Sequence, residues 1–253
     1  MSSFGIRPNT APADFDPWRD LPPGFFDSYL ALHQEFTPRQ QLLASARRRV
    51  LATAHRGVLP DHLPPSEATE GDWRIELPAW CADQRNQMTG PADDGELVVK
   101  LLNSGAPGVM IDLEDAMANE WCHVLQGHAN AVQALHGALT YEDAKRGGQV
   151  GIRPSATVTW VRVRGLHLGQ AGVVPDELTS ASLFDLALLV HNVDPGRLRH
   201  PLAIYIPKSE SADEALWWRD VFQRLAQLKG LPRDHIKCMA LVESHPQIGR
   251  AHV

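Results

Sequence analysis

Hydrophobic and polar positions follow a βα rhythm over most of the chain. From about residue 84, short apolar runs alternate with stretches in which apolar residues recur at helical spacing. Nearly continuous apolar strands joined by helices indicate an α/β fold with a parallel sheet, either doubly wound or closed into a barrel. The apolar runs predict five strands near residues 86–90, 107–112, 157–163, 202–206 and 236–242.

The first 83 residues have a different pattern. Residues 1 to about 25 are rich in Pro, Asp and Gly and predict an extended arm. Residues 23–57 predict a helix that Pro38 interrupts at a new first turn. Arg47 to Arg49 fit a solvated helix face, and residues 62–80 predict a connecting loop.

The stretch "VTWVRVRGLHL", residues 158–168, places two arginines in an apolar strand. Side chains two positions apart point the same way, so Trp160, Arg162 and Arg164 are expected on one face. Val161 and Val163 are expected on the other face. The pattern predicts a strand that is buried on one side and either charged or anion-binding on the other.

Composition narrows the classes of partner. The 253 residues are 43% apolar, enough for a substantial core, and carry 24 basic and 30 acidic residues for a net charge of −6. This balance argues against nucleic acid and membrane surfaces as partners. Three widely spaced cysteines without a CxxC pair indicate a reducing cytoplasm. The sequence shows neither an export signal nor a spanning helix, since its most apolar run, residues 183–190, is short and contains Asp185.

Ionisable residues follow four of the predicted strands at their C-terminal ends. In parallel α/β folds these ends form the active site, and no glycine-rich phosphate loop competes with that prediction. Loop charges are also common without function, but their shared position after four strands favours a site. The residues are Asp112, Glu114 and Asp115, then Arg162 and Arg164, then Lys208 and Glu210, and finally Glu243.

Carboxylates without a cysteine or histidine motif suit a hard cation such as Mg²⁺, and a neighbouring arginine can stabilise a developing oxyanion. This combination predicts a small keto-acid or carboxylate substrate and enolate chemistry. Two other groups are expected to be structural. His123, His128 and His136 fit surface or core-edge positions, and the adjacent Trp217 and Trp218 fit helix packing.

Several segments resemble malate synthases of the shorter bacterial and plant type. They include "MTGPADDGELVVKLLNSGAPGVMIDLEDA", "VRVRGLHL" and "YIPKSESADEALWWRDVFQRLAQLKGLPRDHIKCMALVES", and the resemblance runs in order from about residue 27 to residue 244. The family implies an N-terminal helical clasp, expected here over residues 1–83. It also implies a TIM barrel, expected here from residue 84 to 253 with only about the first five βα units, before a C-terminal helical plug.

The resemblance also implies a reaction and a set of site residues. Malate synthases condense acetyl-CoA with glyoxylate to malate and CoA in the glyoxylate cycle, using Mg²⁺. Arg162 matches the arginine that polarises the substrate oxygens, and Glu243 matches a direct Mg²⁺ ligand. Asp112 and Glu114 match acids that hold metal waters and orient that arginine. Arg164, Asp115 and Lys208 are further candidates for substrate binding.

The resemblance lacks two parts of the family's site. Neither the second metal ligand, an aspartate in a "GRWDY"-like segment, nor the catalytic aspartate base has a counterpart, so the base is expected beyond residue 253. The chain is therefore expected to be an N-terminal half with negligible turnover alone. Two alternatives stay open, namely an acyl-CoA lyase of the malyl-CoA or citramalyl-CoA type and a non-catalytic half-barrel. The sequence does not indicate the oligomeric state.

Overall fold

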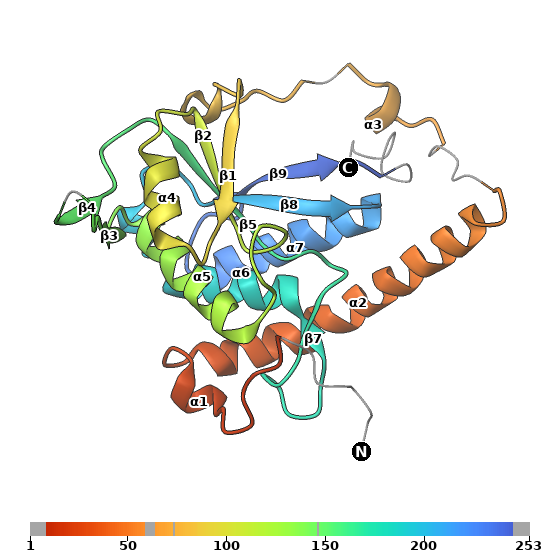
Figure 1. The fold of residues 1–253 in the computed structure, drawn as a ribbon. Helices are drawn as coiled ribbons and strands as arrows, with labels where there is room; N and C mark the ends of the chain where they lie inside the picture. The colour runs from red at the N-terminus through yellow and green to blue at the C-terminus, as the bar shows by residue number, and fades with distance from the viewer. Residues whose placement is uncertain (1–8, 59–63, 73, 146, 245–253) are drawn as a thin grey trace.

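A parallel sheet of five strands forms the centre of the protein (Figure 1). The computed structural model describes residues 9–58, 64–72, 74–145 and 147–244. All five predicted strands are confirmed, each within a few residues of its expected ends. They are β1 (Gln87–Pro91), β2 (Gly108–Asp112), β5 (Val158–Arg162), β8 (Ala203–Ser209) and β9 (Lys237–Val242).

The order of the strands decides between the two predicted architectures. The strands lie side by side in chain order, β1-β2-β5-β8-β9, and every pair is parallel. A doubly wound sheet reverses its order at a switch point, whereas a barrel adds each strand beside the previous one. The sheet is therefore of the barrel type. It is a partial barrel, since no described residues join β9 to β1.

Helices follow the strands and cover one face of the sheet (Figure 1). Long α2 packs across α6 and α7 as an outer layer. The short α3 and η1 belong to the segment that passes along the other face, where Trp80 and Cys81 pack with Met110 and Trp160. The helices are α1 (Pro17–Asp20), α2 (Phe25–Ala54), α3 (Glu67–Glu70), η1 (Ala79–Cys81), α4 (Gly95–Leu102), α5 (Trp121–Leu135), α6 (Ala181–Asn192), η2 (Pro195–Arg197) and α7 (Ala212–Leu228).

Helix α6 has no counterpart among the predicted elements. Residues Ala181 to Val190 are all buried, and the helix contacts α2, α5 and α7. A helix buried all round loses the polar stripe that marks a surface helix, so its 3.6-residue period is faint. Two short hairpins were also not predicted, β3 (Thr140–Glu142) with β4 (Gln149–Gly151) and β6 (Gly169–Gln170) with β7 (Thr179–Ser180).

The predicted break at Pro38 is wrong, because α2 continues through it as one helix of 30 residues. Proline removes one backbone hydrogen bond, but buried residues on both sides of it, such as Phe36 and Leu43, anchor the helix to the core. The predicted arm contains α1, and its residues 1–8 lie outside the described part, as do 245–253. The division at residue 83 falls between η1 and β1 and stays a prediction.

Two expectations about helices can be compared directly with the structure. Trp217 and Trp218 are packing residues, as predicted, and are 0% and 1% exposed. In the described ranges, no helix combines the length and the apolar character needed to cross a bilayer.

Candidate functional site

The predicted residues gather where the parallel strands end. Asp112 is the last residue of β2 and Arg162 the last of β5, and the two are directly opposite in the strand pairing. Lys208 lies near the end of β8, and Glu243 follows β9. The sequence of apolar strand followed by polar residue therefore brings side chains from four units to one edge of the sheet.

Asp112 and Arg162 form a bidentate ion pair at this edge. Arg162 Nε donates to Asp112 Oδ1 at 2.7 Å, and Nη2 donates to Oδ2. The backbone N–H groups of Glu114 and Ala116 each donate to Asp112 at 2.8 Å. A carboxylate accepts about four hydrogen bonds, so that of Asp112, which is fully buried, is saturated. Its geometry fixes the plane of the Arg162 guanidinium.

Lys208 enters the same cluster from β8. Its Nζ lies 2.8 Å from Asp115 Oδ1 and 2.9 Å from Glu114 Oε2, the second contact being an ion pair without hydrogen-bond geometry. The pairing of β8 with β9 shifts between Ile206 and Ser209, and Lys208 has a φ of 49°. Non-glycine residues in this left-handed region are strained and often occur at functional sites.

The charges in the cluster affect one another. Burial raises the pKa of Glu114, although Lys208 opposes this. Hydrogen bonding to Lys208 lowers the pKa of Asp115. Burial disfavours the charged form of Arg162, but the hydrogen bonds to Asp112 and the charges of Asp112, Glu114 and Asp115 together outweigh it and raise the pKa of the guanidinium. The arginine is therefore held as a cation in a largely buried position.

Glu243 directly follows β9 and is exposed. Burial raises the pKa of Tyr205, and the charges of Arg162 and Glu243 act on Tyr205 in opposite directions. His167, which the sequence did not single out, has its Nε2 3.9 Å from Glu114 Oε1. Among the described residues, the acids predicted to bind or support a metal do not form a group of three with ligand atoms within 4.8 Å.

Arg164 does not join the cluster. The strand ends at Arg162, and the guanidinium of Arg164 turns to α6, where Nε and Nη2 bind Asp185. Its Nη1 donates to Asn119 and Gln170 at 3.0 Å each. His128 completes the network, with Nε2 3.1 Å from Asp185 Oδ1. The expectation that both arginines share one face is wrong, and we do not retain Arg164 as a substrate-binding residue.

Arg47 contacts the site from α2, contrary to the prediction of a solvated face. Its Nη2 donates to the carbonyl oxygen of Lys208 at 2.7 Å and to Glu214 Oε2 at 2.6 Å. Nη1 lies 3.4 Å from Glu210 Oε1. The helix therefore holds the strained turn between β8 and α7. The neighbouring Arg48 and Arg49 are exposed, as predicted.

Replacing Arg47 by methionine is expected to lower the free energy of unfolding by about 1.5–3 kcal/mol, the cost of hydrogen bonds to a charged group. The Glu214 side chain, only 1% exposed, would lose its cation. Urea denaturation measures the loss, and hydrogen exchange should become faster at residues 208–211. Arg49→Met at an exposed position is the matched control, with an expected change within about 0.5 kcal/mol. Equal effects of the two substitutions would contradict the assigned contact.

Comparisons with known proteins agree with this arrangement. Residues 158–248 match the family model for the malate synthase TIM barrel domain. The malate synthase of Myxococcus xanthus is 35% identical over 236 residues, which are 89% of this chain and 42% of the relative. Malate synthase A of Escherichia coli is 34% identical over 219 residues, 84% of this chain and 40% of the relative.

A third relative is the bifunctional glyoxylate cycle protein of Caenorhabditis elegans, which is 33% identical over 219 residues, 84% of this chain and 22% of the relative. The chain thus spans less than half the length of these proteins. The matched residues include β5, β8 and β9, which carry or directly precede Arg162, Lys208 and Glu243. The chain is therefore similar to the malate synthases over most of its length, and its residues 158–248 match their TIM barrel domain.

Proposed function

We propose that the strand-end cluster is part of a malate synthase active site, in a protein that condenses acetyl-CoA with glyoxylate to give malate and CoA. The observation that carries the proposal is the saturated Asp112–Arg162 pair at the C-terminal edge of a barrel-type sheet. The relationship to malate synthases over most of the chain supports this choice of substrates.

Arg162 is proposed to stabilise the negative charge that develops on oxygen. When the enolate of acetyl-CoA attacks the aldehyde carbon of glyoxylate, the carbonyl electrons move to the aldehyde oxygen. A preorganised guanidinium stabilises such an oxyanion more than it stabilises the substrate. Asp112 accepts from Nε and Nη2, which leaves the Nη1 donors, 3.3 Å from Asp115, for other partners.

The residues present fit Mg²⁺ in the chemistry of their donors. Mg²⁺ takes one or two carboxylates and keeps waters or a bidentate substrate, and Glu114, Asp115 and Glu243 offer carboxylate oxygens at this edge. We assign Glu243 as the direct ligand and Glu114 as an acid that holds a metal water. When bound, the ion polarises the aldehyde as a Lewis acid. Asp112 is kept as the positioning residue of Arg162, since its oxygens already accept four donors.

Lys208 has a proposed electrostatic role. Its ammonium offsets part of the negative charge of the two acids beside Arg162, which lowers the repulsion that an anionic substrate meets at this cluster. Burial alone would lower the pKa of Lys208, but the hydrogen bonds to Asp115 and the ion pair with Glu114 raise it, so the charge persists at neutral pH. No described residue is assigned as the base that forms the enolate.

The test is the release of free thiol from acetyl-CoA that depends on both glyoxylate and Mg²⁺. The 253-residue chain alone is expected to show negligible turnover, because it has no assigned base. Residues 1–244, joined to the part of the Escherichia coli relative that follows its matched region, are expected to release thiol.

A joined protein that melts cooperatively yet releases no thiol would contradict the proposal. Near-normal turnover by the 253-residue chain would support the reaction and contradict only the expectation that this chain lacks the base. Supplying malyl-CoA and citramalyl-CoA to both proteins tests the lyase alternative, which predicts their cleavage without dependence on acetyl-CoA.

The proposed compartment is the cytoplasm. Cys81, Cys122 and Cys238 are all free thiols, which supports a reducing environment.

A further inference from the structure

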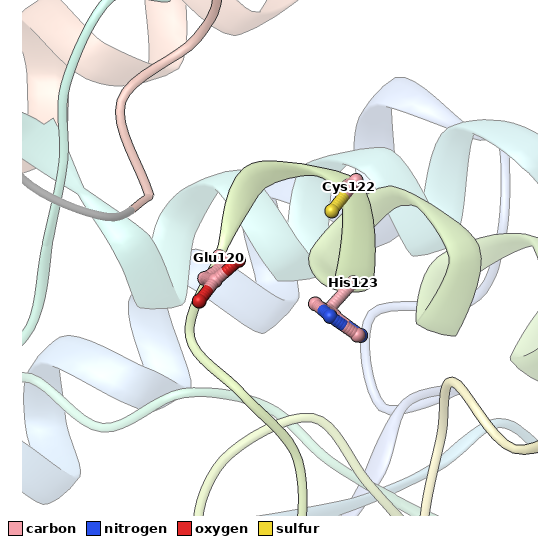
Figure 2. Close-up of side chains that lie close together, drawn as sticks. All are labelled: Glu120, Cys122 and His123. Atoms are coloured by element: carbon pink, nitrogen blue, oxygen red, sulfur yellow. The ribbon is translucent and has the colours of Figure 1, made fainter.

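A second group of possible metal ligands lies at the start of α5, apart from the strand-end cluster. Glu120, Cys122 and His123 each offer one ligand atom, and these atoms lie within 4.8 Å of one another (Figure 2). Among the described residues, no other group of three His, Cys, Asp or Glu side chains has its ligand atoms this close together. The proposed function gives these residues no role.

The local backbone explains why the three side chains converge. Glu120 is the N-cap of α5 with an extended backbone, and its carboxylate makes no capping hydrogen bond. Cys122 and His123 belong to the first helical turn, and Figure 2 shows all three side chains gathered around it. Glu120 and Cys122 are exposed, so both can rotate toward a shared ion.

Asp93 gives independent support from another part of the chain. It lies in the loop between β1 and α4, and its Oδ2 is 2.6 Å from His123 Nδ1. With the Nδ1 proton donated to this carboxylate, Nε2 carries the lone pair that a metal needs. Metal-binding histidines usually donate their second ring N–H to a carboxylate, a backbone carbonyl or water, which fixes the ring and raises its basicity.

The mixed donor set selects the class of ion. Magnesium and calcium prefer oxygen ligands, whereas a thiolate, an imidazole and a carboxylate together suit Zn²⁺. Three protein ligands leave the fourth tetrahedral position for water. We propose that Glu120, Cys122 and His123 bind Zn²⁺, with Asp93 as the positioning residue of His123. On binding, a Zn–S bond replaces the S–H bond of Cys122, and the proton goes to solvent.

Cobalt titration of the complete, tag-free 253-residue chain tests the site. Co²⁺ occupies zinc sites and is coloured, and a thiolate ligand adds a sulfur-to-cobalt charge-transfer band. We expect one equivalent of Co²⁺ to give this band together with tetrahedral d–d absorption, and one equivalent of Zn²⁺ to remove both. A magnesium-type carboxylate site gives no sulfur band, so the result is independent of the proposed function.

Three variants make the test specific. Cys122→Ser is expected to abolish the charge-transfer band, whereas Cys238→Ser, the matched change at another exposed free cysteine, retains it. Asp93→Asn is expected to keep the band and raise the Kd for Co²⁺ by about 10- to 100-fold. Circular dichroism confirms that each variant is folded. The proposal is overturned if the parent chain shows no sulfur band, if the band survives in Cys122→Ser, or if Asp93→Asn binds as tightly as the parent.

Discussion

Replacing Asp185 by leucine is expected to lower the free energy of unfolding by about 3–5 kcal/mol, measured by urea denaturation at neutral pH. Asp185 and Arg164 are both 0% exposed and bind each other through Nε and Nη2. Asp185 also accepts from the backbone N–H of Arg164 at 2.9 Å. Removing the carboxylate leaves a buried guanidinium without a counter-ion, and this is among the most costly changes in a protein interior.

The double variant Arg164→Met with Asp185→Leu is the control for this expectation. Replacing both charges by apolar groups removes the desolvation penalty of each, so the double variant should be destabilised by less than the sum of the two single variants. We expect the difference to be at least about 1 kcal/mol. Strictly additive losses would show that the two side chains are not coupled.

The same pair predicts the dependence of stability on pH. Burial would raise the pKa of Asp185, but the charge of Arg164 and the hydrogen bonds from His128 and Arg164 lower it to about 2, from an ordinary 3.8. A carboxyl group with a depressed pKa stabilises the fold above its unfolded pKa, and this stability is lost as pH falls from about 4 to about 2. Its full value is about 2 kcal/mol. The acid-induced loss should be smaller by this amount in Asp185→Leu.

Replacing Arg162 by lysine is expected to lower the kcat for glyoxylate-dependent thiol release by about 10²–10³, measured in the joined protein. Lysine keeps the positive charge but cannot form the two parallel bonds that Asp112 accepts from Nε and Nη2. The effect should fall on kcat more than on KM, because the lost interaction is strongest with the oxyanion.

Two further variants define the cause of that effect. Asp112→Asn keeps Arg162 but replaces one accepting oxygen by a donor group, so it should lower kcat more than it raises KM. It should also lower the melting temperature, because the largely buried guanidinium loses its counter-ion. Arg199→Lys changes an exposed arginine that bonds to Ser155 away from the strand ends, and it should leave both constants unchanged. An Arg162→Lys protein with normal kcat would exclude the proposed role.

The strands and the strand-end residues could be predicted from the sequence because both depend on local pattern. A buried parallel strand needs a continuous apolar run, and the first polar residue after it marks its end, as Asp112 does for β2. The position of Lys208 follows from the same rule. Its left-handed backbone could not be predicted, because a positive φ is typical of glycine and not of lysine.

The remaining features depend on contacts between distant parts of the chain. Arg47 and Arg49 are alike in a helical pattern, and only the approach of Glu214 from α7 makes one of them half-buried. Arg162 and Arg164 are equally alike in a strand pattern, and they separate because the strand stops between them and Asp185 binds the second. The sequence pattern identifies such charged residues. It does not identify their partners, because these residues lie more than 20 positions away in the chain.

The strand order of the central sheet also bears on how the protein is made. Each strand of the sheet pairs with the strand that is synthesised before it. No strand therefore has to insert between two strands that are already paired. Once β1 and β2 have left the ribosome they can pair with each other, and β5, β8 and β9 then extend the sheet one strand at a time. Helix α2 is synthesised before any of these strands, but the helices α6 and α7 that cover its apolar side come much later in the chain. This apolar side therefore stays exposed during translation and needs protection from aggregation.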